Sequence, residues 1–161
     1  MTDLAMAGHR LRAHGQKKAV PVTVNQGMFS GYASVFGQVD GGGDMVMPGA
    51  FRQSLLQRKS KNIRMLFQHD PSSPVGVWLE MFEDQHGLFV RGKLASGVQR
   101  AIELNNLLDQ GAIDGLSIGF KTVRARRDRT SGIRKIYKLD LWEVSLVTFP
   151  MLASARISKT T

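Results

Sequence analysis

The sequence predicts a strand-dominated α+β domain. Most of the chain from Val20 onward consists of segments rich in β-branched and aromatic residues, and two stretches show the apolar spacing of a helix. The chain has 17 glycines against 5 prolines in 161 residues, which fits many turns rather than disorder. This length is enough for one domain with its own core. We expect a flexible basic arm over residues 1–18, one folded domain over 19–157 and a short tail over 158–161.

The strands and helices are predicted in this order. Strands are expected at 20–24, 29–36 and 63–67, in a hairpin of 75–82 with 88–94, and in a second hairpin of 116–126 with 133–149. A glycine-dense turn at 40–44 and a short helix from Pro48 to about Arg58 come between the second and third strands. A longer helix follows Ser96, which forms the pattern of a capping box with Gln99, and Gly111 stands where a C-terminal cap belongs.

The composition excludes several kinds of chemistry. The chain has no cysteine, so a disulfide, a thiolate zinc site and a cysteine nucleophile are all excluded. No run approaches 18 apolar residues, and the basic N-terminus lacks the continuous apolar stretch of a secretory signal. Nothing in the residues indicates a cofactor or a metal site.

The net charge of +9 is unevenly distributed. Between Lys121 and Lys138 there are eight lysines or arginines against Asp128 alone, which gives the second predicted hairpin a local charge of +7. Such a hairpin is either simply solvated or binds an anionic partner, a nucleic acid or an acidic protein surface. Composition leaves both interpretations open.

Residues 115–119 have the pattern Gly-x-Ser-x-Gly, with Ser117 at the centre. In α/β-hydrolases this turn carries the nucleophile, and the catalytic histidine follows it in the chain. Here all four histidines precede Ser117, so the order of residues excludes that fold. A serine hydroxyl needs a neighbouring base to become a nucleophile, so the base for Ser117 must come from upstream. Gly115 and Gly119 flank the serine and let a substrate backbone approach closely.

His69 is the best candidate for that base. His9 and His14 lie in the predicted arm, and His86 lies in a predicted hairpin turn beside a glycine. His69 instead ends an apolar strand before a loop that contains two prolines, a position where functional side chains are often mounted. A histidine at a strand end is nevertheless more often structural than catalytic.

A carboxylate would complete the set by orienting the histidine. Glu143 interrupts an otherwise apolar strand, where an unpaired charge is costly. Asp140, on the opposite face of the same strand by alternation, is the second choice. Pairing of Glu143 with an arginine of the basic hairpin is at least as good an explanation of its position.

Taken together, five ordered motifs make the chain similar to the prohead (capsid maturation) proteases of tailed bacteriophages. The resemblance extends over about residues 29–150, and its motifs are Gly-Tyr-Ala-Ser-Val-Phe at 31–36, Met-Pro-Gly-Ala-Phe at 47–51, Phe-Gln-His-Asp at 67–70 with Pro-Val-Gly at 74–76, Asp-Gly-Leu-Ser-Ile-Gly-Phe at 114–120 and Trp-Glu-Val-Ser-Leu-Val-Thr-Phe-Pro at 142–150. It implies His69 as base, Ser117 as nucleophile and Glu143 as third member. It also implies the fold of the herpesvirus assemblins, a closed or nearly closed β-barrel with a few surrounding helices.

The function implied by this resemblance is a serine endopeptidase of prohead maturation. It would cut the scaffolding segment of the major capsid protein, and itself, inside the immature capsid in the host cytoplasm. No cofactor and no membrane is implied, and a homo-oligomer is left open. Gly119 and Arg156 are candidates for supporting the oxyanion. The chain departs from many relatives after Pro150 and ends at Thr161, without their longer tail. The alternative is a noncatalytic basic module that binds nucleic acid or scaffold through residues 121–138.

Overall fold

The structure, a computed structural model, describes residues 27–158. The predicted strand 20–24 and the predicted arm lie outside the described residues, as does most of the predicted tail. The described part contains eight strands, two α-helices and one 3-10 turn. In chain order these are β1 (Met28–Val35), β2 (Asp44–Val46), α1 (Arg52–Arg58), η1 (Ser60–Asn62), β3 (Arg64–Phe67), β4 (Asp70–Glu83), β5 (Gly87–Leu94), α2 (Gln99–Asp109), β6 (Gly115–Arg127), β7 (Arg134–Val147) and β8 (Ile157–Ser158).

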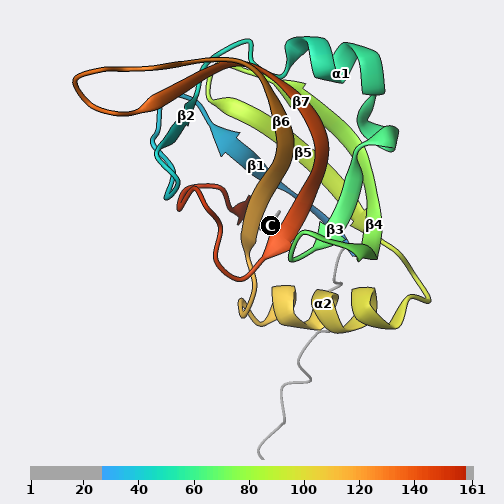
Figure 1. Cartoon of the computed structure of the whole chain (residues 1–161). Helices are drawn as coiled ribbons and strands as arrows, with labels where there is room; N and C mark the ends of the chain where they lie inside the picture. The colour runs from blue at the N-terminus through green and yellow to red at the C-terminus, as the bar shows by residue number, and fades with distance from the viewer. Residues whose placement is uncertain (1–26, 159–161) are drawn as a thin grey trace, which may run out of the picture.

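All eight strands belong to one curled sheet, with α1 and α2 at its opposite ends (Figure 1). The strand order is β2-β7-β3-β4-β5-β1-β8, and β6 pairs with the other side of β7. The predicted strand-dominated α+β class with a few helices is confirmed, but the sheet is a curled half-barrel and not the predicted closed or nearly closed barrel. Strand β8 has only two residues, and a single isolated bridge links Gly115, at the start of β6, to Arg156, the residue before β8. The domain is therefore strand-dominated, and its single sheet is curled but open.

Strands β6 and β7 form the longest hairpin and supply much of the core from one of their two faces. The fully buried residues of the inner face are Leu116, Ile136, Leu139, Leu141, Val144 and Leu146. Bulges skip Val123 on β6, and Tyr137 and Trp142 on β7. Each bulge adds a residue to one strand only, which keeps the apolar side chains on the core side along a strongly twisted ribbon. The opposite, outer face is left for polar residues.

The hairpin between β3 and β4 turns through two residues. Phe67 pairs with Asp70, and the residues between them, Gln68 and His69, have φ of 54° and 59°. Two successive positive φ values define a type I′ turn, which usually contains asparagine or glycine. The strand predicted at 75–82 therefore begins earlier, and the predicted proline loop is reduced to an unpaired bulge over residues 71–73.

Two local predictions have opposite outcomes at α2. The predicted capping box is wrong: the helix begins at Gln99, and the Gln99 side chain donates a hydrogen bond to Glu103 instead of back to the cap. The predicted C-terminal cap is confirmed, because Gly111 has φ of 71° and its N–H donates to the carbonyl of Leu108. None of the helices in the described residues is long and apolar enough to cross a membrane.

Candidate functional site

Three strands bring Ser117, His69 and Glu143 to one end of the sheet. Ser117 on β6 lies directly opposite Ser145 on β7 in the antiparallel pairing. On the other side of β7, β3 runs parallel and places Leu66 beside Ser145. His69 follows two residues after the end of β3, so the turn that carries it reaches back over β7.

His69 and Glu143 are in direct contact. His69 Nδ1 lies 2.5 Å from Glu143 Oε1, and the other carboxylate oxygen, Oε2, accepts a 2.6 Å hydrogen bond from Ser145 Oγ. The Glu143 side chain is only 13% exposed, so its charge needs these partners. The hydrogen bond to Glu143 raises the pKa of His69, although partial burial of the ring opposes the shift. Glu143 therefore pairs with a histidine and not with an arginine of the basic hairpin.

The turn that carries His69 is fixed to β7 by its own backbone and side chain. His69 N–H donates to Ser145 Oγ at 3.0 Å, and Gln68 N–H donates to the carbonyl of Leu146 at 3.0 Å. Gln68 Nε2 also donates to Thr148 Oγ1 at 2.7 Å. Positive φ is costly for residues with a side chain and persists where the surroundings determine it, as these bonds do here. The imidazole is consequently held at one position along β7.

Ser117 lies in a different environment from Ser145. Ser145 has no exposed surface and makes two hydrogen bonds, whereas Ser117 is 7% exposed and its Oγ makes no hydrogen bond within the described residues. The described residues contain no fully buried side-chain oxygen or nitrogen that lacks a partner, so Ser117 Oγ keeps access to solvent. The Ser145 hydroxyl is therefore engaged in two hydrogen bonds and closed to solvent, whereas the Ser117 hydroxyl can still contact a substrate.

Gly119 leaves room for the carboxylate. It lies opposite Glu143, and a Cβ added to it would stand 2.0 Å from Glu143 Oε1. The second glycine of the Gly-x-Ser-x-Gly pattern is thus required by the side chain across the ribbon.

We expect Gly119→Ala to displace the Glu143 carboxylate from His69, which should lower the pKa of His69 toward its ordinary value. Overpacking of this kind costs about 1–3 kcal/mol of stability. Titration of the His69 ring protons by NMR, with thermal unfolding alongside, measures both effects. Gly42→Ala, in an exposed loop where the new methyl meets only the Asp40 side chain at 3.3 Å, is the control. An unchanged His69 titration in Gly119→Ala would show that Glu143 does not depend on this space.

The second-choice carboxylate, Asp140, is engaged elsewhere. Both its oxygens accept 2.8 Å hydrogen bonds from Arg58, and Oδ2 also accepts one from Trp142 Nε1. The Arg58 guanidinium lowers the pKa of Asp140 to about 2. Its contacts give it no link to His69, so the geometry favours Glu143 as the orienting acid.

The remaining predicted residues are distributed as follows. Arg156 is paired with Asp114 and also donates to the carbonyl of Ala153, beside the start of β6. His86 lies in the β4–β5 turn, with its ring edge-on to Tyr32 at 4.5 Å between centroids. His9 and His14 lie outside the described residues.

Sequence reasoning did not identify Ser145. A serine two residues after a buried glutamate, on a strand that is otherwise apolar, was the available signal, because alternation places both side chains on one face. What could not be anticipated is that its hydroxyl joins the Glu143 carboxylate to the His69 backbone.

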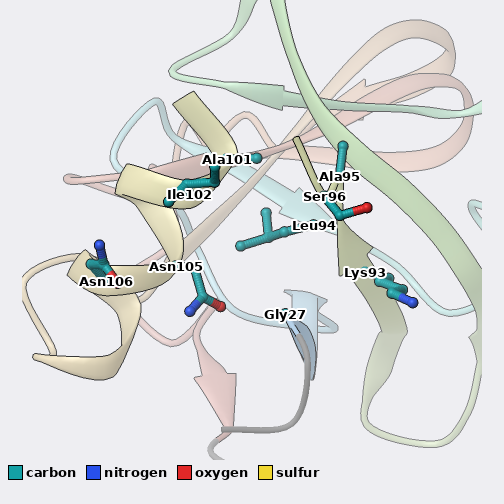
Figure 2. A pocket seen from close by; sticks show the side chains of 9 residues that line it. All are labelled: Gly27, Lys93, Leu94, Ala95, Ser96, Ala101, Ile102, Asn105 and Asn106. Carbon is teal, nitrogen blue, oxygen red and sulfur yellow. The ribbon is translucent and has the colours of Figure 1, made fainter. Parts of the chain in front are cut away.

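A separate hollow of about 520 Å³ lies between the end of β5 and α2 (Figure 2). Its lining includes Leu94, Ala101 and Ile102 together with Asn105 and Lys93, and none of the site residues described above borders it. The hollow is mainly apolar and is distinct from the candidate site.

The structure is thus a curled sheet with a histidine at the β3–β4 turn and a serine and a glutamate on two adjoining strands. Its fold is similar to the bacteriophage T4 capsid assembly protease, with a TM-score of 0.64 over 76% of this chain and 82% of that one, at 14% identity. It is also similar to the Kaposi's sarcoma-associated herpesvirus (KSHV) protease in complex with a hexapeptide phosphonate inhibitor, with a TM-score of 0.52 over 81% of this chain and 63% of that one, at 15% identity. Identities this low show the fold alone.

Family membership follows from sequence. Residues 16–161 match the caudovirus prohead serine proteases, and the chain belongs to this family, as the motifs predicted. It is 39% identical to the prohead protease of Enterobacteria phage HK97 over 137 residues, which is 83% of this chain and 60% of that protein. It is 31% identical to the prohead protease of Escherichia phage T5 over 121 residues, 74% of this chain and 56% of that protein. The chain thus matches somewhat over half the length of these relatives.

Proposed function

We propose that this chain is a serine endopeptidase of prohead maturation, with Ser117 as nucleophile, His69 as general base and Glu143 as orienting acid. The observation that carries the proposal is the fixed His69–Glu143 pair beside a solvent-accessible serine on the adjoining strand. Membership of the prohead protease family supports the reaction class. Because HK97 and T5 relatives are named prohead proteases, the substrates we propose are the scaffolding segment of the major capsid protein and the protease itself, inside the immature capsid.

The proposed reaction is acyl transfer in two stages. Ser117 Oγ attacks the scissile carbonyl carbon while His69 Nε2 takes the hydroxyl proton. Glu143 stabilises the resulting imidazolium through Nδ1. The tetrahedral intermediate then expels the amine, which takes the proton from His69 and leaves an acyl-serine. Water attacks this ester with His69 again as base, and Ser117 is regenerated.

The neighbouring residues contribute through position. Ser145 holds the Glu143 carboxylate and the His69 backbone in register, which limits rotation of the imidazole away from Ser117. Hydrogen bonds between nucleophile and base are often long before substrate binds, so the missing Ser117–His69 bond is compatible with the mechanism. Gly119 and Arg156 remain our candidates for supporting the oxyanion.

Labelling with an aryl phosphonate ester tests the proposal directly. The folded chain should gain one covalent adduct, and peptide mass mapping should place it on Ser117. Ser145, which is fully buried, should stay unmodified and serves as an internal control. Absence of any adduct, or an adduct on another serine, would instead favour the noncatalytic basic module.

A further inference from the structure

The hairpin of β6 and β7 carries cations that face each other across its two strands. In the antiparallel register Arg124 lies directly opposite Lys138, and Arg126 lies directly opposite Lys135. Like charges directly opposite each other in an antiparallel pair are destabilising. We call these four residues the cationic face. The end of the hairpin projects from the body of the domain, as the long loop between β6 and β7 in Figure 1 shows.

Nothing in the described part of the chain neutralises the cationic face. None of its four residues has an ion pair within the described residues, whereas nearby Arg134 is paired with Asp44. The one acid between Lys121 and Lys138, Asp128, accepts hydrogen bonds from the backbone of Thr130 and Ser131 and interacts with Lys135 only electrostatically. The electrostatic repulsion among these four cations would therefore be reduced by a bound anionic partner.

The cationic face lies on the same side of the ribbon as the candidate site. The inner side is marked by fully buried partners, such as Ile136 opposite Ala125 and Leu139 opposite Thr122. Alternation, with the bulges counted, places the pairs Ser117–Ser145, Gly119–Glu143, Lys121–Asp140 and then the two cation pairs on the outer side. The bulge at Trp142 thus puts Asp140 on the same side as Glu143, not on the opposite face as simple alternation predicted, and its charge is matched by Arg58. At about 3.3 Å per residue, Ser117 and Arg126 are roughly 30 Å apart along β6.

We propose that the cationic face binds an acidic segment of the protein substrate that is cut at Ser117. The proposal rests on the proposed function. An extended polypeptide bound along the outer side of the ribbon reaches from the site to the cationic face in about nine residues. This continuity favours a protein partner over a nucleic acid. A single-strand platform would also need exposed aromatic rings between the cations, and the ring present, that of Tyr137, is covered by Arg124, whose guanidinium carbon is 5.5 Å from the ring centroid.

The test measures binding of the full chain to a fluorescent 20-residue polyglutamate and to a 10-base-pair DNA duplex, by anisotropy at low salt. The variant Arg126→Glu/Lys135→Glu reverses one cation pair while keeping two like charges opposite each other. The matched control, Arg52→Glu/Lys61→Glu, makes the same change of net charge at exposed residues of α1 and η1. We expect at least tenfold weaker polyglutamate binding in the hairpin variant and less than about threefold in the control.

Equal losses in the two variants, or a specific loss of DNA binding with polyglutamate binding unchanged, would overturn the proposal; the second result would identify a nucleic-acid surface. Thermal midpoints within a few degrees of the parent show that both variants are folded. Phosphonate labelling of Ser117 should proceed at the same rate in the hairpin variant, since the cationic face does not touch the site. If the parent chain takes no label, the proposed function fails while the polyglutamate result still decides whether this surface binds acidic segments.

Discussion

Replacing Ser117 with alanine is expected to abolish processing of the capsid protein in cells that express both proteins. Loss of the nucleophile in comparable serine proteases lowers kcat by about 10⁶-fold, which leaves no processing detectable on a gel. The fold should survive, because Ser117 Oγ makes no hydrogen bond in the described structure and alanine fits the same space. We expect the thermal midpoint of Ser117→Ala to be close to that of the parent.

The control for this experiment is Ser96→Ala, in the exposed segment before α2, which should process the capsid protein at the parental rate. Processing that continues undiminished in Ser117→Ala would show that another residue is the nucleophile. A loss of processing that coincides with unfolding would be recognised from the thermal midpoint, and phosphonate competition on the parent would then decide the assignment.

The second large effect is expected at Glu143. Glu143→Gln keeps the shape of the side chain but removes the charge that stabilises the imidazolium, and we expect kcat/KM to fall by about 10²- to 10⁴-fold. The loss should remain smaller than that of Ser117→Ala, because the carboxylate acts through His69. Asp140→Asn is the matched comparison. Because Asp140 is bound to Arg58 and Trp142 and not to His69, the kcat/KM of this variant should stay within about threefold of the parent value.

The pH dependence gives a second readout for the same pair. His69 must be neutral to accept a proton, so activity should rise with pH through the pKa of His69, which Glu143 raises. Removing the charge in Glu143→Gln lowers that pKa, so the acid limb of the profile should move to lower pH while the maximum falls. Asp140→Asn should leave the limb in place. A crippled Asp140→Asn beside a fully active Glu143→Gln would assign the acid role to Asp140.

The sequence by itself predicted the β4–β5 and β6–β7 hairpins, the two helices and the glycine cap at Gly111 that follows α2, but it did not predict β2 or β8. These features depend on local patterns: alternation for strands, apolar spacing for helices and a glycine that tolerates positive φ at a cap. It also selected His69 from four histidines, because the position at a strand end is visible in the order of residues.

Only the tertiary structure decided how these parts meet. Parallel pairing of β3 with β7 joins His69 to Glu143 across 74 residues, and no local pattern specifies which strands become neighbours. The same is true of the open sheet, since closure fails where β8 is too short to pair along β6. The type I′ turn at Gln68 and His69, formed without glycine, is imposed by the bonds to β7 and contradicts local preference. The positions of Ser145 and of the opposed cations likewise depend on register, which long-range pairing sets and composition does not.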